Sequence, residues 1–301
     1  AVMTLISPEF DLIASHFTRP AATAVLGVGD DCALVDVSNG MDLAVSTDTM
    51  VSGTHFFPDV DPETLGHKAL AVNLSDMAAM GAMPYWAMLA LTVPDVNHEW
   101  LAKFAKGFFD LAEEFGVSLI GGDTTKGPLT MTVTIMGEVP AGAALRRNGA
   151  KVGNDIWVSG NLGDAALAVA HRRGLLELSE EDYMEAVMRL YEPTPRVALG
   201  QALRGLATSA SDISDGLLAD LEHICALSHV GATVEADRLP VSAIGAAHID
   251  SPAGLAAVAA GGDDYELCFT APENARDSIE DLTDMLGVPL TRIGEIRKGK
   301  G

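Results

Sequence analysis

Carboxylates stand beside glycine turns at several places in this sequence, and these residues are the best suited to bind a cation or a phosphate-bearing ligand. The stretches are "LGVGDDCALV" (26–35), "STDTMVSGTHF" (46–56), "LIGGDTT" (119–125), "NLGDAAL" (161–167), "SDISDG" (211–216) and "AGGDDYEL" (260–267). Few lysines or arginines stand near them. Mg²⁺ takes oxygen ligands and usually bridges one or two carboxylates to substrate phosphates. We interpret the turns as cation-binding positions, while for any single turn Asp also serves as a turn residue or helix N-cap.

Asp76 has a different setting, inside a segment of helical composition. In "KALAVNLSDMAAMGAMP" helical spacing sets it on the same face as a stripe that we expect to pack inward, formed by Ala69, Val72, Asn73 and Met80. An unpaired carboxylate there is costly, so the position needs a cation, a proton or a polar cleft. A salt bridge to Lys68 is the simpler alternative, but Lys68 is eight residues away and is not adjacent on the helix. We therefore expect Asp76 to bind a divalent metal.

The other acidic candidates share one feature, because each stands at a predicted strand end or in a glycine turn, where α/β proteins gather ligands. They are Asp30, Asp48, Asp123, Asp212 and Asp215. The last two precede a helical segment and could instead cap it. Hydroxyls beside the carboxylates could add metal or phosphate contacts, and these are Ser46, Thr47 and Ser214.

Phosphate binding would depend on backbone groups more than on basic side chains. Glycines at 121, 122, 261 and 262 would let backbone N–H groups approach a polyphosphate without interference from Cβ. The sequence has no Walker A motif and no protein-kinase signature. Arg146 and Arg147 are the natural basic candidates, unless they are simply an exposed pair in a linker.

Composition restricts the class of protein. The chain has 301 residues, 48% of them apolar, which is enough for one large domain or two smaller ones with a real core. The net charge of −23 argues against a nucleic-acid or anionic-membrane partner. Three separated cysteines (Cys32, Cys225, Cys268) indicate neither a disulfide framework nor a thiolate zinc site. No apolar run is long enough to span a bilayer, so we expect a cytoplasmic protein.

Segments typical of strands and helices alternate along the chain, which predicts α/β (α+β) architecture. In the first half we expect strands at 31–37, 42–47, 117–120 and 129–139 and helices at 62–80 and 97–115. On the second helix Trp100, Phe104, Phe108 and Leu111 form an apolar face that should be core, and Gly116 follows as a C-cap.

The stretch 140–155 is rich in Gly and Ala with little periodicity, so we divide the chain into domains 1–145 and 146–301 there. In the second half we expect strands at 155–160, 232–236, 265–270 and 290–296. We expect helices from residue 164, within 181–206, and at 214–228, 252–260 and 273–286.

Taken in order, the motifs become recognisable as a set. "GVGDDCALV", "STDTMVSGTHF", "HKALAVNLSDMAAMGAMP", "LIGGDTT", "SDISDGL" and "GGDDYELCFT" resemble the thiamine-monophosphate kinases, a family of the superfamily that includes aminoimidazole ribonucleotide synthetase. The resemblance covers nearly the entire chain. It implies a two-domain fold of that superfamily, a homodimer formed through the strands of the N-terminal domain, and an ATP site between the domains.

The resemblance also implies roles for individual residues. The implied Mg²⁺ ligands are Asp30, Ser46, Thr47, Asp48, Asp76, Asp123, Asp212 and Asp215. The implied ATP contacts are Gly122, Asp123, Arg147 and Ser214, and the implied thiamine-phosphate contacts are His55 and Asp263. From its sequence neighbours Phe56 and Phe57 alone, His55 would be a histidine at the edge of the core. Family members usually carry an aromatic residue near the C-terminus that covers the thiamine, whereas this sequence ends at "GEIRKGKG".

The implied reaction is transfer of the ATP γ-phosphoryl group to thiamine monophosphate, giving thiamine diphosphate and ADP, with Mg²⁺ screening the two negatively charged reactants. Two alternatives stay open. One is another ATP-using enzyme of the same superfamily, although selenophosphate-type chemistry would want a reactive cysteine in a mobile glycine loop and Cys32 falls in a predicted strand. The other is a non-catalytic protein that binds a nucleotide or a divalent cation.

Overall fold

The computed structural model describes residues 8–299 and divides them into two compact units, which are described separately. The first unit contains residues 8–74 and 84–138, and the second unit contains residues 75–83 and 139–299. Among these residues no helix combines the length and apolar character needed to cross a membrane.

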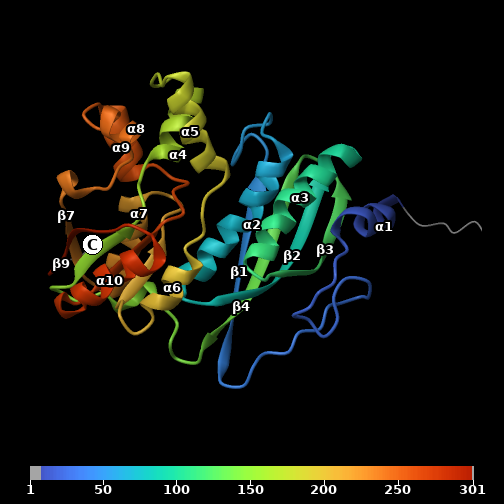
Figure 1. Cartoon of the computed structure of the whole chain (residues 1–301), viewed down its shortest axis with the longest axis horizontal. Helices are drawn as coiled ribbons and strands as arrows, with labels where there is room; N and C mark the ends of the chain where they lie inside the picture. The colour runs from blue at the N-terminus through green and yellow to red at the C-terminus, as the bar shows by residue number, and fades with distance from the viewer. Residues whose placement is uncertain (1–7, 300–301) are drawn as a thin grey trace, which may run out of the picture. The chain divides into compact units, whose positions relative to one another are not determined.

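A four-stranded mixed sheet in the order β1-β4-β2-β3 forms the first unit (Figure 1). Its strands are β1 (Met41–Val51), β2 (Met83–Val93), β3 (Ser118–Lys126) and β4 (Thr130–Pro140). Helices α2 (Pro62–Ala79) and α3 (His98–Glu114) lie across one face of this sheet. The alternation of β4 explains its two faces, because Met131, Val133 and Ile135 are buried while the intervening threonines are partly exposed. The apolar run at 85–93 forms β2, which pairs in parallel with β3.

Helices α2 and α3 approach each other at two glycines. A Cβ on Gly66 would overlap the carbonyl oxygen of Phe104, and a Cβ on Gly107 would overlap that of Glu63. Asn97 caps α3 by accepting hydrogen bonds from two backbone N–H groups, and Gly116 follows the helix with a φ of 66°. The predicted apolar face of α3 is confirmed as core at Phe104, Phe108 and Leu111, whereas Trp100 is only partly buried.

The predicted strand at 31–37 is wrong. After α1 (Pro8–Leu12) and the π-helical turn η1 (Ile13–Phe17), the chain runs as a loop in which the isolated bridge Leu26–Leu34 is the nearest approach to sheet structure. No neighbouring strand covers the apolar residues there, and Leu34 is half exposed. Cys32 is therefore an exposed loop residue, so its predicted position in a strand no longer argues against selenium chemistry.

Two other boundaries differ from the sequence-based expectation. β1 was predicted to end at Asp48 but continues to Val51, which places Ser46, Thr47 and Asp48 inside the strand. Asp123 was predicted at a strand end but lies within β3, since Gly121 and Gly122 extend that strand instead of ending it. In both cases pairing to a neighbouring strand overrides the turn preference of Gly and Asp.

The second unit contains a five-stranded sheet in the order β6-β8-β5-β9-β7, in which every neighbouring pair is antiparallel. The strands are β5 (Asp155–Ser159), β6 (Ser209–Asp212), β7 (Gly231–Val234), β8 (Leu267–Ala271) and β9 (Leu290–Arg297). β5 and β8 are buried along their whole length, and the adjoining apolar core includes Ile156, Ile213 and Leu217.

Helices surround this sheet. They are α4 (Asp164–Arg172), α5 (Glu180–Tyr191), α6 (Val197–Leu203), α7 (Leu217–Ser228), α8 (Ala243–His248), α9 (Pro252–Ala260) and α10 (Arg276–Leu286), with short 3₁₀ turns η2 (Arg147–Gly149), η3 (Ala236–Arg238) and η4 (Glu273–Ala275). The predicted helical stretch 181–206 is two helices, because prolines at 193 and 195 interrupt it. α8 was not predicted.

Candidate functional site

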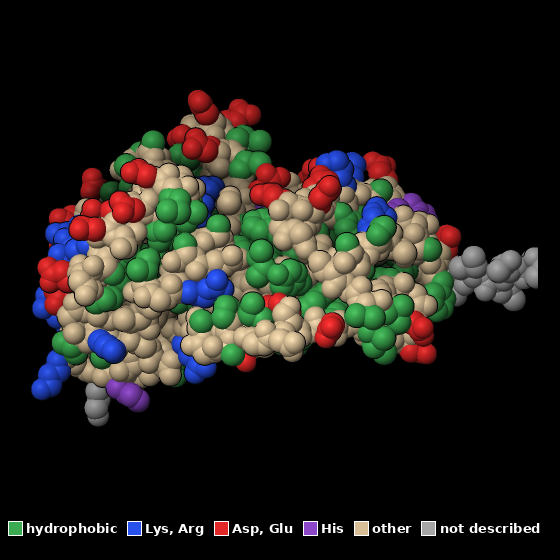
Figure 2. Space-filling view, turned by 60° about the horizontal axis from the view of Figure 1, so that its bottom comes forward, with side chains coloured by type: hydrophobic (Ala, Val, Ile, Leu, Met, Phe, Trp, Pro, Cys, Tyr) green, Lys and Arg blue, Asp and Glu red, His purple; other side chains and the backbone are tan. Residues whose placement is uncertain are grey.

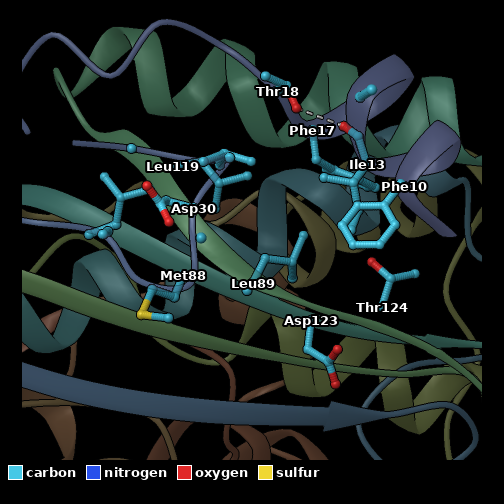
Figure 3. A pocket seen from close by; sticks show the side chains of 18 of the residues that line it. Phe10, Ile13, Phe17, Thr18, Asp30, Met88, Leu89, Leu119, Asp123 and Thr124 are labelled. Carbon is cyan, nitrogen blue, oxygen red and sulfur yellow. Dashed lines mark hydrogen bonds between the residues drawn. The ribbon is translucent and has the colours of Figure 1, made fainter. Parts of the chain in front are cut away.

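A cavity of about 700 Å³ lies in the first unit (Figure 3). Its walls come from α1 and η1, from the glycine loop 27–33, and from β2 and β3. Figure 3 shows Phe10, Ile13 and Phe17 grouped on one side, with Asp30 across from them. A cavity of this size, apolar with a few polar groups, fits a small organic ligand.

Three of the predicted site residues line this one cavity. Asp30 is exposed in the glycine loop and its Oδ1 accepts a hydrogen bond from the backbone N–H of Asp31, at 2.9 Å. Gly122 and Asp123 lie on β3. Gly122 also has a structural reason to be glycine, because a Cβ there would overlap the carbonyl oxygen of Leu89 on β2. Four carboxylates from three parts of the chain therefore line the cavity, and these are Glu9, Asp30, Asp31 and Asp123.

The predicted residues of β1 and its following turn do not line the cavity. Thr47 donates through Oγ1 to the carbonyl oxygen of Val133 on β4, at 3.1 Å. His55 is exposed, and its Nδ1 accepts a hydrogen bond from the backbone N–H of Val51 at 2.9 Å. Ser46 and Asp48 are partly buried on the opposite face of β1 from Thr47.

In the second unit, Asp212 is brought next to the end of α2. The hydroxyl of Ser75 donates to Oδ2 of Asp212 at 2.8 Å, and Asp212 is 4% exposed. Asp76 follows Ser75 directly and is partly buried, so the helix places it near Asp212. Ala69, Val72 and Asn73 are buried, as the helical periodicity predicted. The prediction is wrong for Met80, which follows the last residue of α2 and is 37% exposed.

The loop 212–216 is held by a residue that sequence reasoning missed. Oδ2 of Asp220 accepts hydrogen bonds from the backbone N–H groups of Ser214, Asp215 and Gly216, at 3.0, 3.1 and 3.2 Å. Burial raises the pKa of Asp220, and these hydrogen bonds only partly oppose the effect. The alternative that Asp212 or Asp215 caps α7 is wrong, because the N-cap residue is Gly216 and no side chain at the cap makes the capping hydrogen bond. Instead, the carboxylate of Asp220, in the first turn of α7, accepts hydrogen bonds from the backbone N–H groups before the helix. Its place in that turn was the available sequence signal.

The loop 212–216 is joined to the turn that contains Asp263. The backbone N–H of Asp263 donates to the carbonyl oxygen of Ser214 at 2.9 Å, and that of Tyr265 donates to Ile213 at 2.8 Å. Both Asp263 and Tyr265 have left-handed backbone conformations, with φ of 67° and 49°. Non-glycine residues adopt this region rarely, and such strain is common where a side chain must be held in a required direction.

Asp264 lies between these two strained residues and is a buried acid. Its Oδ1 accepts a hydrogen bond from the backbone N–H of Gly163 at 2.8 Å, whereas Oδ2 has no hydrogen-bond partner among residues 8–299. Burial raises the pKa of Asp264 well above its usual range. This shift favours the protonated, uncharged form of the Asp264 carboxyl group. It borders a cavity of about 10 Å³ together with Asp263 and Thr194, which leaves room for about one water molecule.

Arg147 is exposed in η2, and its carbonyl oxygen accepts a hydrogen bond from the hydroxyl of Ser228 at 3.0 Å. This contact fixes the backbone of η2 against α7. The guanidinium is left at the surface of the second unit, where a phosphate could reach it.

The acidic residues form no ready-made metal cage. Over the described range 8–299, no group of three or more His, Cys, Asp or Glu side chains is placed to hold an ion. Mg²⁺ usually keeps several waters and is held by one or two carboxylates together with substrate phosphates. Carboxylates that line an open cavity, such as Asp30 and Asp123, are compatible with this kind of binding. Figure 2 shows Asp and Glu side chains in separate groups on the visible face, with hydrophobic side chains exposed between them.

Comparisons with known proteins agree with this fold. The family model for the AIR synthase related protein, N-terminal domain, matches residues 29–139, and that for the AIR synthase related protein, C-terminal domain, matches residues 151–301. The chain thus has the mixed α/β two-domain fold of AIR synthase related proteins.

Individual relatives narrow the family further. Thiamine-monophosphate kinase of Salmonella typhimurium is 49% identical over 292 residues, covering 96% of this chain and 90% of that protein. The crystal structure of thiamine-monophosphate kinase from Stenotrophomonas maltophilia matches with a TM-score of 0.89 at 47% identity, over 97% and 94% of the two chains. AaThiL complexed with AMPPCP and TMP matches with a TM-score of 0.78 at 29% identity, over 97% and 90%. The chain belongs to the thiamine-monophosphate kinase family.

Proposed function

We propose that this chain transfers the γ-phosphoryl group of ATP directly to thiamine monophosphate, giving thiamine diphosphate and ADP. The observation that carries the mechanism is the pair of main-chain hydrogen bonds that join the 212–216 loop to the turn at Asp263. The loop contains the proposed metal and nucleotide residues Asp212, Ser214 and Asp215, and the turn contains the proposed substrate residue. Family membership supports the choice of reactants.

The acceptor needs no general base. A phosphate monoester has a second pKa of about 6, so at neutral pH most of the acceptor is already dianionic. The difficulty is electrostatic, because this dianion must approach a triphosphate in line with the leaving ADP. Catalysis then consists of positioning and charge stabilisation.

Residues of the first unit would hold the metal-bound phosphates. Asp30 and Asp123 would act as ligands from the cavity, with Gly122 offering its backbone to the nucleotide. Ser46, Thr47 and Asp48 of β1 are further proposed ligands, and His55 would contact the substrate phosphate. Mg²⁺ ions held in this way would screen the repulsion between the reactants and polarise the transferred group.

Residues of the second unit are also proposed to bind metal and nucleotide. Asp76, Asp212 and Asp215 are proposed as metal ligands, while Ser214 and Arg147 would contact ATP. Asp220 would fix the direction of the backbone that carries Ser214 and Asp215, through its three hydrogen bonds.

The test compares Asp76→Asn with Asp110→Asn, an exposed aspartate of α3 that pairs with Lys106. At limiting Mg²⁺ we expect Asp76→Asn to lose about 100-fold or more in turnover while its thermal unfolding stays close to that of the parent. Asp110→Asn should keep near-normal turnover. Near-normal turnover of Asp76→Asn would contradict the ligand role. ADP release must also depend on thiamine monophosphate, since a protein that only binds nucleotide releases none.

The uncovered face of the four-stranded sheet supports a second proposal, that the chain forms a homodimer through this face. Its side chains include Leu43 and Val45, which are 43% and 57% exposed, and Met88, which is 38% exposed. Polar contacts on this face include the Thr49 and Thr132 hydroxyls, which hydrogen-bond to each other at 2.8 Å. Light scattering should give a dimer mass for the parent and a monomer mass for Val45→Asp.

A further inference from the structure

A buried ion pair stands next to the strained turn of Asp263. The carboxylate of Glu266 accepts hydrogen bonds from Nε and Nη2 of Arg196, at 2.7 and 2.6 Å, and from the hydroxyl of Ser159, at 2.6 Å. The two charged side chains are only 12% and 4% exposed. Two parallel bonds from one guanidinium fix both the position and the plane of a carboxylate.

The pair also fixes the backbone that follows the turn. The hydroxyl of Ser159, which donates to Glu266, accepts a hydrogen bond from the backbone N–H of Leu267 at 2.9 Å. The carbonyl oxygen of Glu266 accepts from the backbone N–H of Ile213 at 2.8 Å. Gly160 lies so close that a Cβ there would overlap Oε1 of Glu266. Residues 266 and 267 are therefore held by β5, by the 212–216 loop and by Arg196 together.

The strained backbone of the turn requires that its flanking residues be held in place. Asp263 and Tyr265 both have positive φ, so the turn stays in this conformation only if its flanks are held. On one flank it follows α9, which ends at Ala260. On the other flank the first residue after Tyr265 is Glu266, so the ion pair begins where the strained backbone ends.

We infer that Arg196 and Glu266 are positioning residues for the thiamine-phosphate site, because their ion pair holds the turn that aims Asp263. This inference rests on the proposed function, in which Asp263 contacts the substrate. Neither residue touches the substrate in this proposal. Arg196 would act at a distance by fixing Glu266, and Glu266 by fixing the backbone of the turn.

A second ion pair in the same unit supplies a matched control. The carboxylate of Asp155, at the other end of β5, accepts hydrogen bonds from Nε and Nη2 of Arg276 at 2.7 and 2.8 Å. Asp155 is 2% exposed, so it is as buried as Glu266. No strained turn adjoins it, since β5 there pairs regularly with Ala271.

The experiment measures KM for thiamine monophosphate, KM for ATP, kcat and thermal unfolding in Glu266→Gln, Asp263→Asn, the double variant and Asp155→Asn. We expect Glu266→Gln and Asp263→Asn each to raise KM for thiamine monophosphate by about tenfold or more, with the double variant within about twofold of the singles, because both act on one contact. Asp155→Asn should lower the unfolding temperature and leave both KM values unchanged. Arg196→Lys keeps the positive charge but cannot form two parallel hydrogen bonds to the carboxylate, so it should give an intermediate KM.

The outcomes separate the inference from the function beneath it. If Asp263→Asn raises KM for thiamine monophosphate and Glu266→Gln does not, the positioning role is overturned and the substrate role of Asp263 stands. If Asp263→Asn has no effect, the substrate role itself fails. Equal KM changes in Glu266→Gln and Asp155→Asn would mean that general destabilisation explains both. Should Glu266→Gln not fold, Arg196→Lys and Ser159→Ala carry the same comparison, and unchanged KM values in both would overturn the inference.

Discussion

β5 has an arginine–carboxylate pair at each end, and the two pairs differ in what surrounds them. Asp155 begins the strand and is bound by Arg276, which is 32% exposed, with Arg292 at 3.5 Å. Ser159 ends the strand and shares Glu266 with Arg196, which is only 12% exposed. The first pair ties α10 to a regular part of the sheet. The second adjoins a turn with two left-handed residues.

This difference shows why the chemistry of an ion pair does not reveal its role. Both carboxylates are buried and both receive two bonds from one guanidinium. What separates them is the solvent access of the arginine and the backbone beside the carboxylate. An ion pair whose arginine is partly exposed to water contributes moderately to the free energy of unfolding. Removing one partner of a buried pair costs much more, because the remaining charge is left buried.

Removing each arginine should therefore have unequal consequences. We expect Arg196→Ala to cost about 3–5 kcal/mol in the free energy of unfolding, because the Glu266 charge is left buried. Arg276→Ala should cost about 1–2 kcal/mol, since water and Arg292 can still reach Asp155. Urea unfolding of both variants measures the difference. Equal losses would remove the distinction between the two ends of β5.

Two glycines sharpen the same comparison. Gly160 and Gly153 both have positive φ, at 62° and 88°, and lie near opposite ends of β5. At Gly153 a Cβ meets nothing within 4 Å, so Gly153→Ala should cost about 1 kcal/mol of backbone strain. Gly160→Ala must also displace Glu266, and we expect about 3 kcal/mol. Thermal unfolding of both variants, with KM for thiamine monophosphate, tests this; similar losses and an unchanged KM would contradict it.

The pH dependence of stability should distinguish the turn from the rest of the unit. Burial raises the pKa of Asp264, and the carboxylates of Glu266 and Asp164 add to this. The unfolded chain loses the proton near pH 4 while the folded chain keeps it, so stability falls as pH rises above about 4. Asp264→Asn has no titrating group at this position. Its free energy of unfolding should therefore fall less between pH 5 and pH 8 than that of the parent, by about 1–2 kcal/mol. Identical pH profiles of unfolding would show that Asp264 is already ionised.

Asp155 should show the opposite sign. Burial alone would raise its pKa, but the hydrogen bonds and charge of Arg276 outweigh burial and lower it. The unfolded chain takes up a proton near pH 4 while the folded chain does not, so the parent loses stability as the pH falls below about 4. In Asp155→Asn the loss in free energy of unfolding between pH 5 and pH 3 should be smaller than in the parent by about 1 kcal/mol. The check is urea unfolding at pH 3 and pH 5, and an unchanged slope would contradict the prediction.

The sequence predicted best those features that depend on local pattern. The periodic apolar face of α3, the Gly116 that follows this helix, and the buried runs that form β5 and β8 have local sequence signals. The structure joins the 212–216 loop to the turn of Asp263, while the metal and substrate roles of the carboxylates in these turns stay predictions.

The features that could not be predicted depend on contacts between residues that are far apart in the sequence. Arg196 and Glu266 are 70 residues apart, and nothing near either residue indicates the other. The strand predicted at 31–37 had a suitable composition but no strand beside it to pair with. Asp220 reads as an ordinary acid of a first helical turn, and only the fold shows that it holds three backbone amides.

The contact between α2 and α3 at Gly66 and Gly107 has a mechanical meaning. At these points one main chain rests on another with no side chain in between. A rotamer change can relax a contact between side chains, but it cannot relax a carbonyl oxygen seated on a glycine Cα. Atomic radii therefore set the closest approach of α2 and α3 at these two points.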